Sequence, residues 1–218
     1  MQKQNKPNPA ALKYFGEVAR NYDSRRAGRQ VTIEDDLIIE KFLDSCDRDC
    51  VIADIPAGTG RAAPSVLKRG YSYIGIDFSE DMLDICRRRI GENPNARLLQ
   101  GDARSIPLKD KEVDNLLCIK FIKWLLTNEM VVDCLREFRR VCKGRVLLNI
   151  KITEDGMAGG GLSNLIMGLN GFFRTKRKIA PIKLTAAAFE EMCITTGWSI
   201  AETFENPVAG HVRFYVLK

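Results

Sequence analysis

Residues 51–61 read VIADIPAGTGR, an apolar segment that runs into an acidic turn containing two glycines. The β-branched and small residues at its start are typical of a buried parallel strand. Gly58 and Gly60 allow a tight turn whose backbone can approach a ligand closely. Asp77 ends the next apolar segment, where a carboxylate can accept hydrogen bonds from both hydroxyls of a ribose. The stretch therefore predicts a site for a nucleoside-containing cofactor.

The composition fits one α/β domain, because 218 residues with 45% hydrophobic content can bury a sizeable core. No apolar run approaches the roughly 20 residues that cross a bilayer, and residues 1–9 lack the apolar core of a signal peptide. We therefore expect a cytoplasmic protein without integral membrane association. Seven scattered cysteines with no C-x-x-C pair, together with a single histidine, predict reduced thiols and no metal site.

The net charge of +6 is moderate and is spread over three basic clusters. Residues 87–89 and 139–140 lie on expected helices beside acidic residues, which is typical of solvated faces. The third cluster is residues 174–178. A concentrated basic face with interleaved aromatics is missing from this pattern, so a nucleic acid is the less favoured partner.

Strand and helix patterns alternate along the chain, which predicts a parallel sheet with helices on both faces. The last two strands are separated by a short turn and must be antiparallel. A capping pattern at Thr32 and Asp35 predicts a helix that begins near Thr32. The expected strands span residues 50–55, 71–76, 96–100, 114–119, 145–152, 198–204 and 212–217. The other expected helices span residues 11–22, 62–69, 80–90, 129–141 and 185–196, the last capped by Gly197.

Two cofactors fit the glycine turn. Residues 58–63 satisfy G-x-G-x-x-A, which together with Asp77 is compatible with NAD. However, the carboxylate of Asp54 would repel a pyrophosphate and could instead hold the amino end of a methionyl group. Residues 100–103 (QGDA) add an acid and a backbone amide at a strand end, where an adenine ring can be read. With about fifty residues ahead of the first strand, these features favour S-adenosylmethionine.

The chain resembles the class I S-adenosylmethionine-dependent methyltransferases, particularly the branch of ubiquinone and menaquinone biosynthesis methyltransferases. Residues 54–60 correspond to the D-x-G-x-G-x-G turn, and residues 75–83 (GIDFSEDML) are similar to the motif that binds ribose and packs on adenine. Residues 101–103 resemble the adenine-reading motif. Residues 14–23 resemble the N-terminal helix whose tyrosine, here Tyr22, closes over the methionyl end.

The resemblance implies a Rossmann-like, mostly parallel seven-stranded sheet of order 3-2-1-4-5-7-6 with the last strand antiparallel. It implies a single methyltransferase domain over residues 1–218: a helical lid (1–45), a cofactor-binding core (46–152), a variable acceptor-side segment (153–184) and a C-terminal helix and hairpin (185–218). The predicted cofactor-binding residues are Tyr22, Asp54, Ala57, Gly58, Thr59, Gly60, Arg61, Asp77, Phe78, Met82, Asp102, Ala103 and Ile119.

Pro56 departs from the family pattern, because it stands where the first glycine of the turn is usual. Proline fixes φ near −65° and has no amide hydrogen, so the turn could be reshaped. One alternative is therefore a non-catalytic scaffold that has kept the fold with a degenerate cofactor site.

No catalytic base is assigned. Similar proteins often carry a histidine pair where Lys123 and Trp124 stand. Lys120 and Lys123 could share one face near the methyl group, as a base or as partners of an anionic acceptor, or could be solvated. His211 is the remaining candidate, although a histidine in a terminal hairpin is more often on the surface. Trp124 could line the acceptor pocket or fill the core.

The expected reaction is in-line methyl transfer to a small molecule that is apolar or anionic, with S-adenosylhomocysteine as product. An amphipathic stretch at residues 162–173, between the glycines 159–161 and the basic run 174–178, could pack on the sheet, cover the acceptor or touch a membrane surface. The rival enzymes are an RNA methyltransferase and an NAD-dependent oxidoreductase. The sequence predicts neither the acceptor atom nor the oligomeric state.

Overall fold

A seven-stranded sheet forms the centre of the protein in the computed structural model, which describes residues 14–25, 27–153 and 182–218. Its strand order is β3-β2-β1-β4-β5-β7-β6, and only β7 runs antiparallel to its neighbours β5 and β6 within a set that is otherwise parallel. This topology confirms the predicted class I methyltransferase fold. The strands are β1 (Val51–Asp54), β2 (Ser72–Asp77), β3 (Ala96–Gln100), β4 (Asn115–Cys118), β5 (Val146–Lys151), β6 (Ile200–Asn206) and β7 (Ala209–Leu217).

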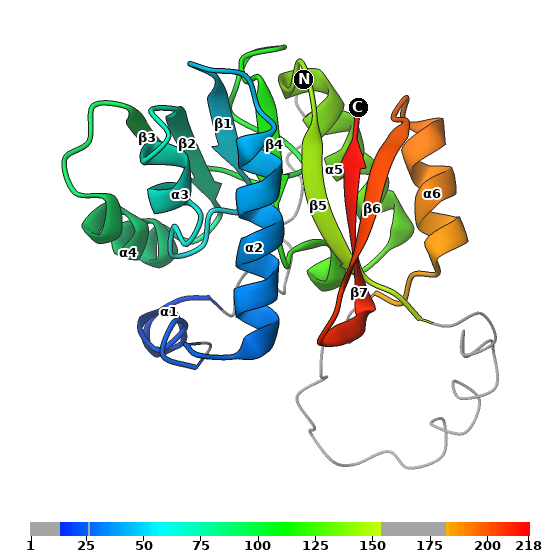
Figure 1. Cartoon of the computed structure of the whole chain (residues 1–218), viewed down its shortest axis with the longest axis horizontal. Coiled ribbons are helices and arrows are strands. Elements are labelled where there is room, and N and C mark those ends of the chain that lie inside the picture. Colours follow the sequence, from blue (N-terminus) through cyan, green and yellow to red (C-terminus); the bar gives the residue numbers. More distant parts are fainter. Residues whose placement is uncertain (1–13, 26, 154–181) are drawn as a thin grey trace, which may run out of the picture.

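Helices cover both faces of the sheet (Figure 1). Neighbouring residues of one strand enter different cores, because successive side chains of a strand point to opposite faces. Ile52 packs with residues of α2 and α3, whereas Ala53 packs with residues of α5 and α6. The helices are α1 (Glu17–Arg20), α2 (Gln30–Asp44), α3 (Ala63–Leu67), α4 (Glu80–Ile90), α5 (Asn128–Val141) and α6 (Ala186–Thr195), with a short 3-10 helix η2 (Ile122–Trp124).

Two expectations about the N-terminal helices are wrong. Helix α2 begins at Gln30, so Thr32 lies inside the helix rather than at its cap. The hydroxyl of Thr32 instead accepts a 3.5 Å contact from the Nζ of Lys120, a tertiary contact that the local pattern does not reveal. The expected helix over residues 11–22 is only α1 within the described residues, because Gly16 stands ahead of it with φ of 60° and binds the side chain of Asp81.

Several expectations concern residues that lie outside the described part of the chain. They are the glycines 159–161, the amphipathic stretch 162–173 and the basic run 174–178. All seven cysteines are described, and all are free thiols, as predicted. No helix among the described residues is long and apolar enough to cross a membrane. The described residues also contain no cluster of three or more potential metal ligands.

Candidate active site

A cavity of about 440 Å³ opens at the carboxyl ends of β1, β2 and β4, within the size range of small-ligand sites. Open α/β sheets bind their ligands at this edge. Every predicted cofactor-binding residue except Gly60 lines the cavity. The lining members of that set are Tyr22, Asp54, Ala57, Gly58, Thr59, Arg61, Asp77, Phe78, Met82, Asp102, Ala103 and Ile119.

The glycine turn presents bare backbone to the cavity. Gly58 has φ of 55°, and a Cβ at this position would meet no atom within 4 Å, so the space in front of the turn is open. Its N–H donates to Oδ2 of Asp77 at 2.8 Å. The left-handed conformation favours glycine, and the open space lets a ligand approach the main chain. The turn and the acid after β2 therefore form one unit.

Gly60 packs against α4 and is not among the residues that line the cavity. A Cβ on Gly60 would lie 2.3 Å from Sγ of Cys86, and its φ is 73°. Cys86 is a fully buried residue of α4. Gly60 thus lets the turn pack closely on α4, and it does not line the cavity because α4 stands on that side.

Pro56 lines the cavity without breaking the turn. The amide groups on either side of it keep the ladder of β1, since Ile55 donates to the carbonyl of Leu117 at 2.9 Å and Ala57 donates to the carbonyl of Ile76 at 2.8 Å. The missing amide hydrogen of proline is therefore accommodated between two intact hydrogen bonds.

Asp77 is fixed by two backbone donors. Its Oδ2 accepts from Gly58 and its Oδ1 accepts from the N–H of Ser79 at 2.9 Å. Burial raises the pKa of Asp77, although both backbone hydrogen bonds favour the charged form. Each carboxylate oxygen has a second lone pair, so the group can still accept hydrogen bonds from a ligand.

Asp54 ends β1 beneath the turn and is buried. The hydroxyl of Tyr73 donates to its Oδ2 at 3.0 Å. Burial raises the pKa of Asp54 to about 7, and the hydrogen bond from Tyr73 and the charge of Arg61 only partly oppose this shift. A cationic ligand in the cavity would restore the ionised form of this acid.

The loop after β3 is held by a residue that the motifs did not indicate. Arg104 binds the carboxylate of Asp102 through Nε at 3.0 Å and Nη2 at 2.6 Å, and its own N–H donates to the same carboxylate at 2.9 Å. Only 5% of the Arg104 side chain is exposed. This bidentate pair fixes Asp102 and Ala103 at the cavity.

The N-terminal segment 14–25 closes over the glycine turn and α4. Asp23 accepts from Oγ1 of Thr59 at 2.8 Å and pairs with Arg89 of α4 at 2.5 Å. Tyr14 packs edge-on against both Tyr22 and Trp124, with ring centroids 5.8 and 6.1 Å apart. These three aromatic rings, which all line the cavity, form one wall of it.

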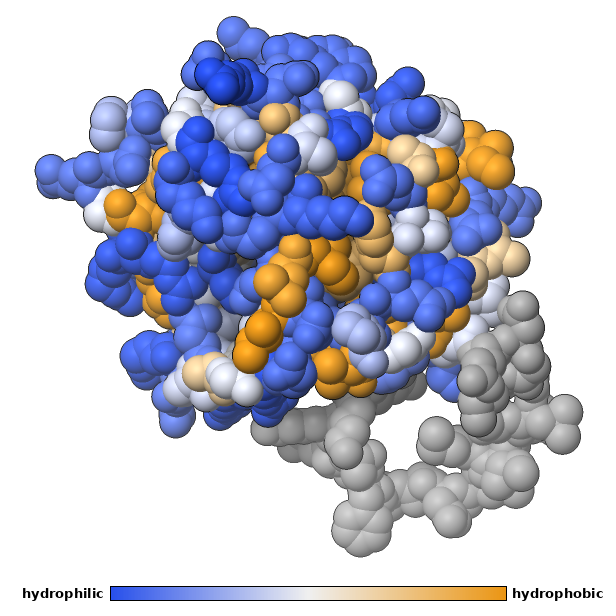
Figure 2. Space-filling model, viewed as in Figure 1, coloured by the Kyte–Doolittle hydropathy of each residue, from blue (hydrophilic) through white to orange (hydrophobic). Residues whose placement is uncertain are grey.

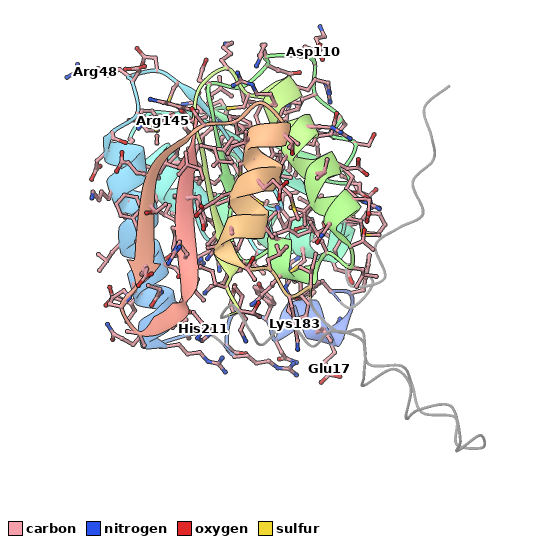
Figure 3. All side chains as sticks on the ribbon, turned by 90° about the vertical axis from the view of Figure 1, so that its right-hand side faces the viewer. Glu17, Arg48, Asp110, Arg145, Lys183 and His211 are labelled. Carbon is pink, nitrogen blue, oxygen red and sulfur yellow. The ribbon has the colours of Figure 1, made fainter. Side chains whose placement is uncertain are left out.

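The three candidate catalytic residues lie in different places. Lys120 lines the cavity, whereas Lys123 does not and instead stacks on Trp124 with Nζ 5.3 Å from the ring centroid. The two lysines do not share a helical face, because Lys120 has φ of 61° and precedes η2. His211 is exposed on β7 and does not line the cavity, although it lies at the same end of the molecule as Glu17 (Figure 3).

Helix α2 supplies side chains to the site that the sequence did not predict. Asp36 pairs with Arg61 of the turn, and Asp35 pairs with Lys120. Burial raises the pKa of Asp36. Ile33 lines the cavity and is 45% exposed, which places it at the opening. Figure 2 shows apolar surface over the region of α2, whose exposed apolar residues are Ile33 and Leu37.

Both basic clusters that the structure describes are engaged by neighbours. Arg87 and Arg89 pair with acids of α4 and of the N-terminal segment. Arg140 pairs with Glu137 and Asp110, and the guanidinium of Arg139 lies over the ring of Trp198. These clusters are therefore not a continuous cationic face for a polyanion.

Known methyltransferases match both the sequence and the fold. Residues 52–145 match the model of a methyltransferase domain family. An uncharacterized methyltransferase-like protein of Schizosaccharomyces pombe is 31% identical over 61% of this chain and 48% of its own length. The tRNA (carboxymethyluridine(34)-5-O)-methyltransferase ALKBH8 of Mus musculus is 26% identical over 65% of this chain and 20% of its own.

The fold comparison agrees with these matches. The magnesium protoporphyrin IX methyltransferase of Synechocystis, solved with bound S-adenosylhomocysteine, superposes with a TM-score of 0.68 at 15% identity over 94% of this chain and 96% of its own. The chain spans about half or less of the length of the curated relatives it matches. The matched segment, the strand order and the cavity at the glycine turn identify residues 52–145 as a methyltransferase domain in a chain that has the class I S-adenosylmethionine-dependent methyltransferase fold.

Proposed function

We propose that this methyltransferase acts on a small molecule that enters the cavity beside the cofactor. The observation that carries this proposal is the composition of the cavity wall. Beyond the predicted cofactor-binding residues, the wall includes Ile33, Lys120, Phe121 and Trp124. These residues offer an apolar surface with one ammonium group, which suits a compact acceptor.

We propose specific roles for the residues around the cofactor. Asp77 accepts from the ribose hydroxyls, Asp54 pairs with the methionyl ammonium, and Phe78 and Met82 pack against adenine. Asp102 and Ala103 read the adenine edge, and Tyr22 covers the methionyl end. The open space before Gly58 and the buried carboxyl group of Asp54 at the cavity support this fit. The bound cofactor supplies an electrophilic methyl group, while the protein orients the acceptor and excludes water.

The proposal includes the domain organisation that the sequence analysis predicts. We propose that residues 1–45 act as the lid and that residues 153–184 act as the acceptor-side segment of a single domain. A cytoplasmic location stays a prediction.

A nucleic-acid acceptor is the second candidate, and the mouse relative named as a tRNA methyltransferase favours it. The ion pairs within the described basic clusters support the small-molecule proposal instead. In this second case the acceptor base would have to leave its stack to reach the cavity.

Titration calorimetry and labelled methyl transfer test the proposal. We expect heat with S-adenosylmethionine and S-adenosylhomocysteine, and none with NAD. With methyl-labelled cofactor and cell extract, we expect label in the fraction of low molecular mass rather than in RNA. Label that appears only in RNA would contradict the small-molecule acceptor and support the nucleic-acid acceptor. Absence of heat with both sulfur compounds would support a scaffold without cofactor.

A further inference from the structure

Among the described residues, Lys120 is the lysine that lines the cavity and brings an ammonium group to its wall. Lys120 follows β4, and its side chain is 15% exposed. Its Nζ lies 2.6 Å from Oδ2 of Asp35, a residue of α2 whose side chain is 1% exposed. Burying two charges costs several kcal/mol unless geometry and further hydrogen bonds compensate for it.

The main chain of Lys120 is also held in a costly conformation. Its φ of 61° lies in the left-handed region, which a residue with a long side chain rarely adopts. Oδ1 of Asn149, a buried residue of β5, accepts from the N–H of Lys120 at 2.6 Å. The start of the side chain is thus fixed from the sheet.

The partner of Lys120 is fixed in turn. Oδ1 of Asp35 accepts from Nδ2 of Asn206 at 2.8 Å, and Asn206, at the end of β6, is fully buried. The same amide donates to the carbonyl of Val31 at 3.2 Å. Side chains from α2, β5 and β6 therefore fix the position of Lys120 and its ammonium group.

Attachment of α2 to the sheet does not account for the cost of the buried Lys120–Asp35 pair and of the left-handed backbone at Lys120. Helix α2 is already attached to the core by Arg61 at Asp36 and by Arg69, which pairs with Glu40 at 2.6 Å. Neither of those attachments involves Lys120. The pair of Asp36 with Arg61 also neutralises the acid of α2 that lines the cavity.

We propose that Lys120 anchors a carboxylate on the acceptor and that this carboxylate is the group methylated. The proposal rests on the proposed function, since it specifies the small molecule. The wall near Lys120 includes Ile33, Phe121 and Trp124, so the acceptor is an organic acid with an apolar body. Lys120 is a specificity-determining residue that touches the reacting group.

Methyl transfer from the sulfonium to a carboxylate requires no proton transfer. One carboxylate oxygen accepts a hydrogen bond from Lys120, and the other forms a bond to the methyl carbon. The carbon–sulfur bond breaks, and its electron pair stays on sulfur. The negative charge of the carboxylate and the positive charge of the sulfonium disappear together, which leaves a methyl ester and a thioether. A carboxylic acid is already ionised near neutral pH, so no general base is required.

The test uses the full chain, methyl-labelled S-adenosylmethionine and the low-molecular-mass fraction of a cell extract. Alkali hydrolyses a methyl ester and releases volatile methanol, whereas methylated amines, ethers and carbons keep their label. We expect most of the transferred label to become volatile. Label that is stable to alkali would overturn the carboxylate.

Three variants test the role of Lys120. Lys120→Met should lower transfer at least 100-fold with an unchanged affinity for S-adenosylhomocysteine, and Lys120→Arg should recover part of the activity. Asp35→Asn keeps the cation and should reduce transfer less than tenfold. Lys143→Met is the matched control, because Lys143 pairs with Asp114 at 2.8 Å and does not line the cavity.

The outcomes separate the two proposals. Equal losses in Lys120→Met and Asp35→Asn, accompanied by weaker S-adenosylhomocysteine binding, would show that the pair only attaches α2 and would overturn the anchor. If the wild-type chain bound no S-adenosylhomocysteine, or labelled no small molecule at all, the proposed function itself would fail.

Discussion

The two halves of the cavity are built by different means. The half around the glycine turn depends on backbone groups that are close in sequence: Asp77 binds the N–H groups of Gly58, 19 residues away, and of Ser79, two residues away. The half around Lys120 depends on side chains from distant segments, since Asn206 reaches Asp35 across 171 residues. The first half is built within one continuous segment from β1 to the start of α4, whereas the second forms only when α2, β4, β5 and β6 have come together.

Loss of Asp77 should have the largest effect on the first half. Asp77→Ala removes the proposed acceptor of both ribose hydroxyls, so we expect S-adenosylhomocysteine to bind at least 100-fold more weakly, about 3 kcal/mol. Calorimetric titration measures this change. Asp84→Ala is a suitable control, because Asp84 lies on the surface of α4 and pairs with Arg87. An Asp77→Ala chain that bound as well as wild type would contradict the proposed ribose site.

A methyl group at Gly60 should destabilise the fold without entering the cavity. Gly60→Ala combines a left-handed conformation with contact against Cys86, and we expect a loss of about 2–4 kcal/mol in the free energy of unfolding. Chemical denaturation measures it. The double variant Gly60→Ala, Cys86→Ala should recover part of the loss.

Gly58→Ala provides the matched comparison within the same turn. Its Cβ meets no atom, so only conformational strain of about 1 kcal/mol is expected, but the methyl group would face the cavity and weaken cofactor binding. Equal stability of the two alanine variants would refute the distinction between a packing glycine and a cavity glycine.

Asp54→Asn should separate stability from binding. Burial raises the pKa of Asp54 to about 7 in the folded chain, above the ordinary value of 3.8 for this side chain. The folded state therefore holds a proton that the unfolded state has lost, and the contribution of Asp54 to stability falls as pH rises from about 4 to about 7. The variant should gain most in melting temperature, relative to wild type, at pH 8 and least at pH 4.

The same acid should make cofactor binding depend on pH. Wild-type affinity for S-adenosylhomocysteine should fall about tenfold between pH 7.5 and pH 5.5, because protonation removes the proposed partner of the methionyl ammonium. Asp54→Asn should bind weakly at both values. A wild-type affinity that does not change with pH would remove Asp54 from the amino-group site.

The smallest effect is expected at the N-terminal segment. Asp23→Asn weakens the contacts to Thr59 and Arg89, which are partly exposed, so we expect only a few-fold loss of affinity. Limited proteolysis should cut residues 14–25 faster in the variant, and the cofactor should slow cutting in wild type. Identical cutting with and without cofactor would argue against a closing role for Tyr22.

The residue pattern predicted the alternation of strands and helices and the glycine turn, and the resemblance to a known family predicted the strand order and twelve residues that line the cavity. Alternating apolar segments predict strands, and a turn with left-handed backbone favours glycine. Short stretches of sequence are therefore enough to predict these features. Three features became apparent only in the folded protein: Gly60 packs on α4, Arg104 fixes Asp102, and Lys120 rather than Lys123 lines the cavity. These contacts form only after distant strands and α2 have packed. The spacing of residues within a short stretch of sequence therefore does not predict them.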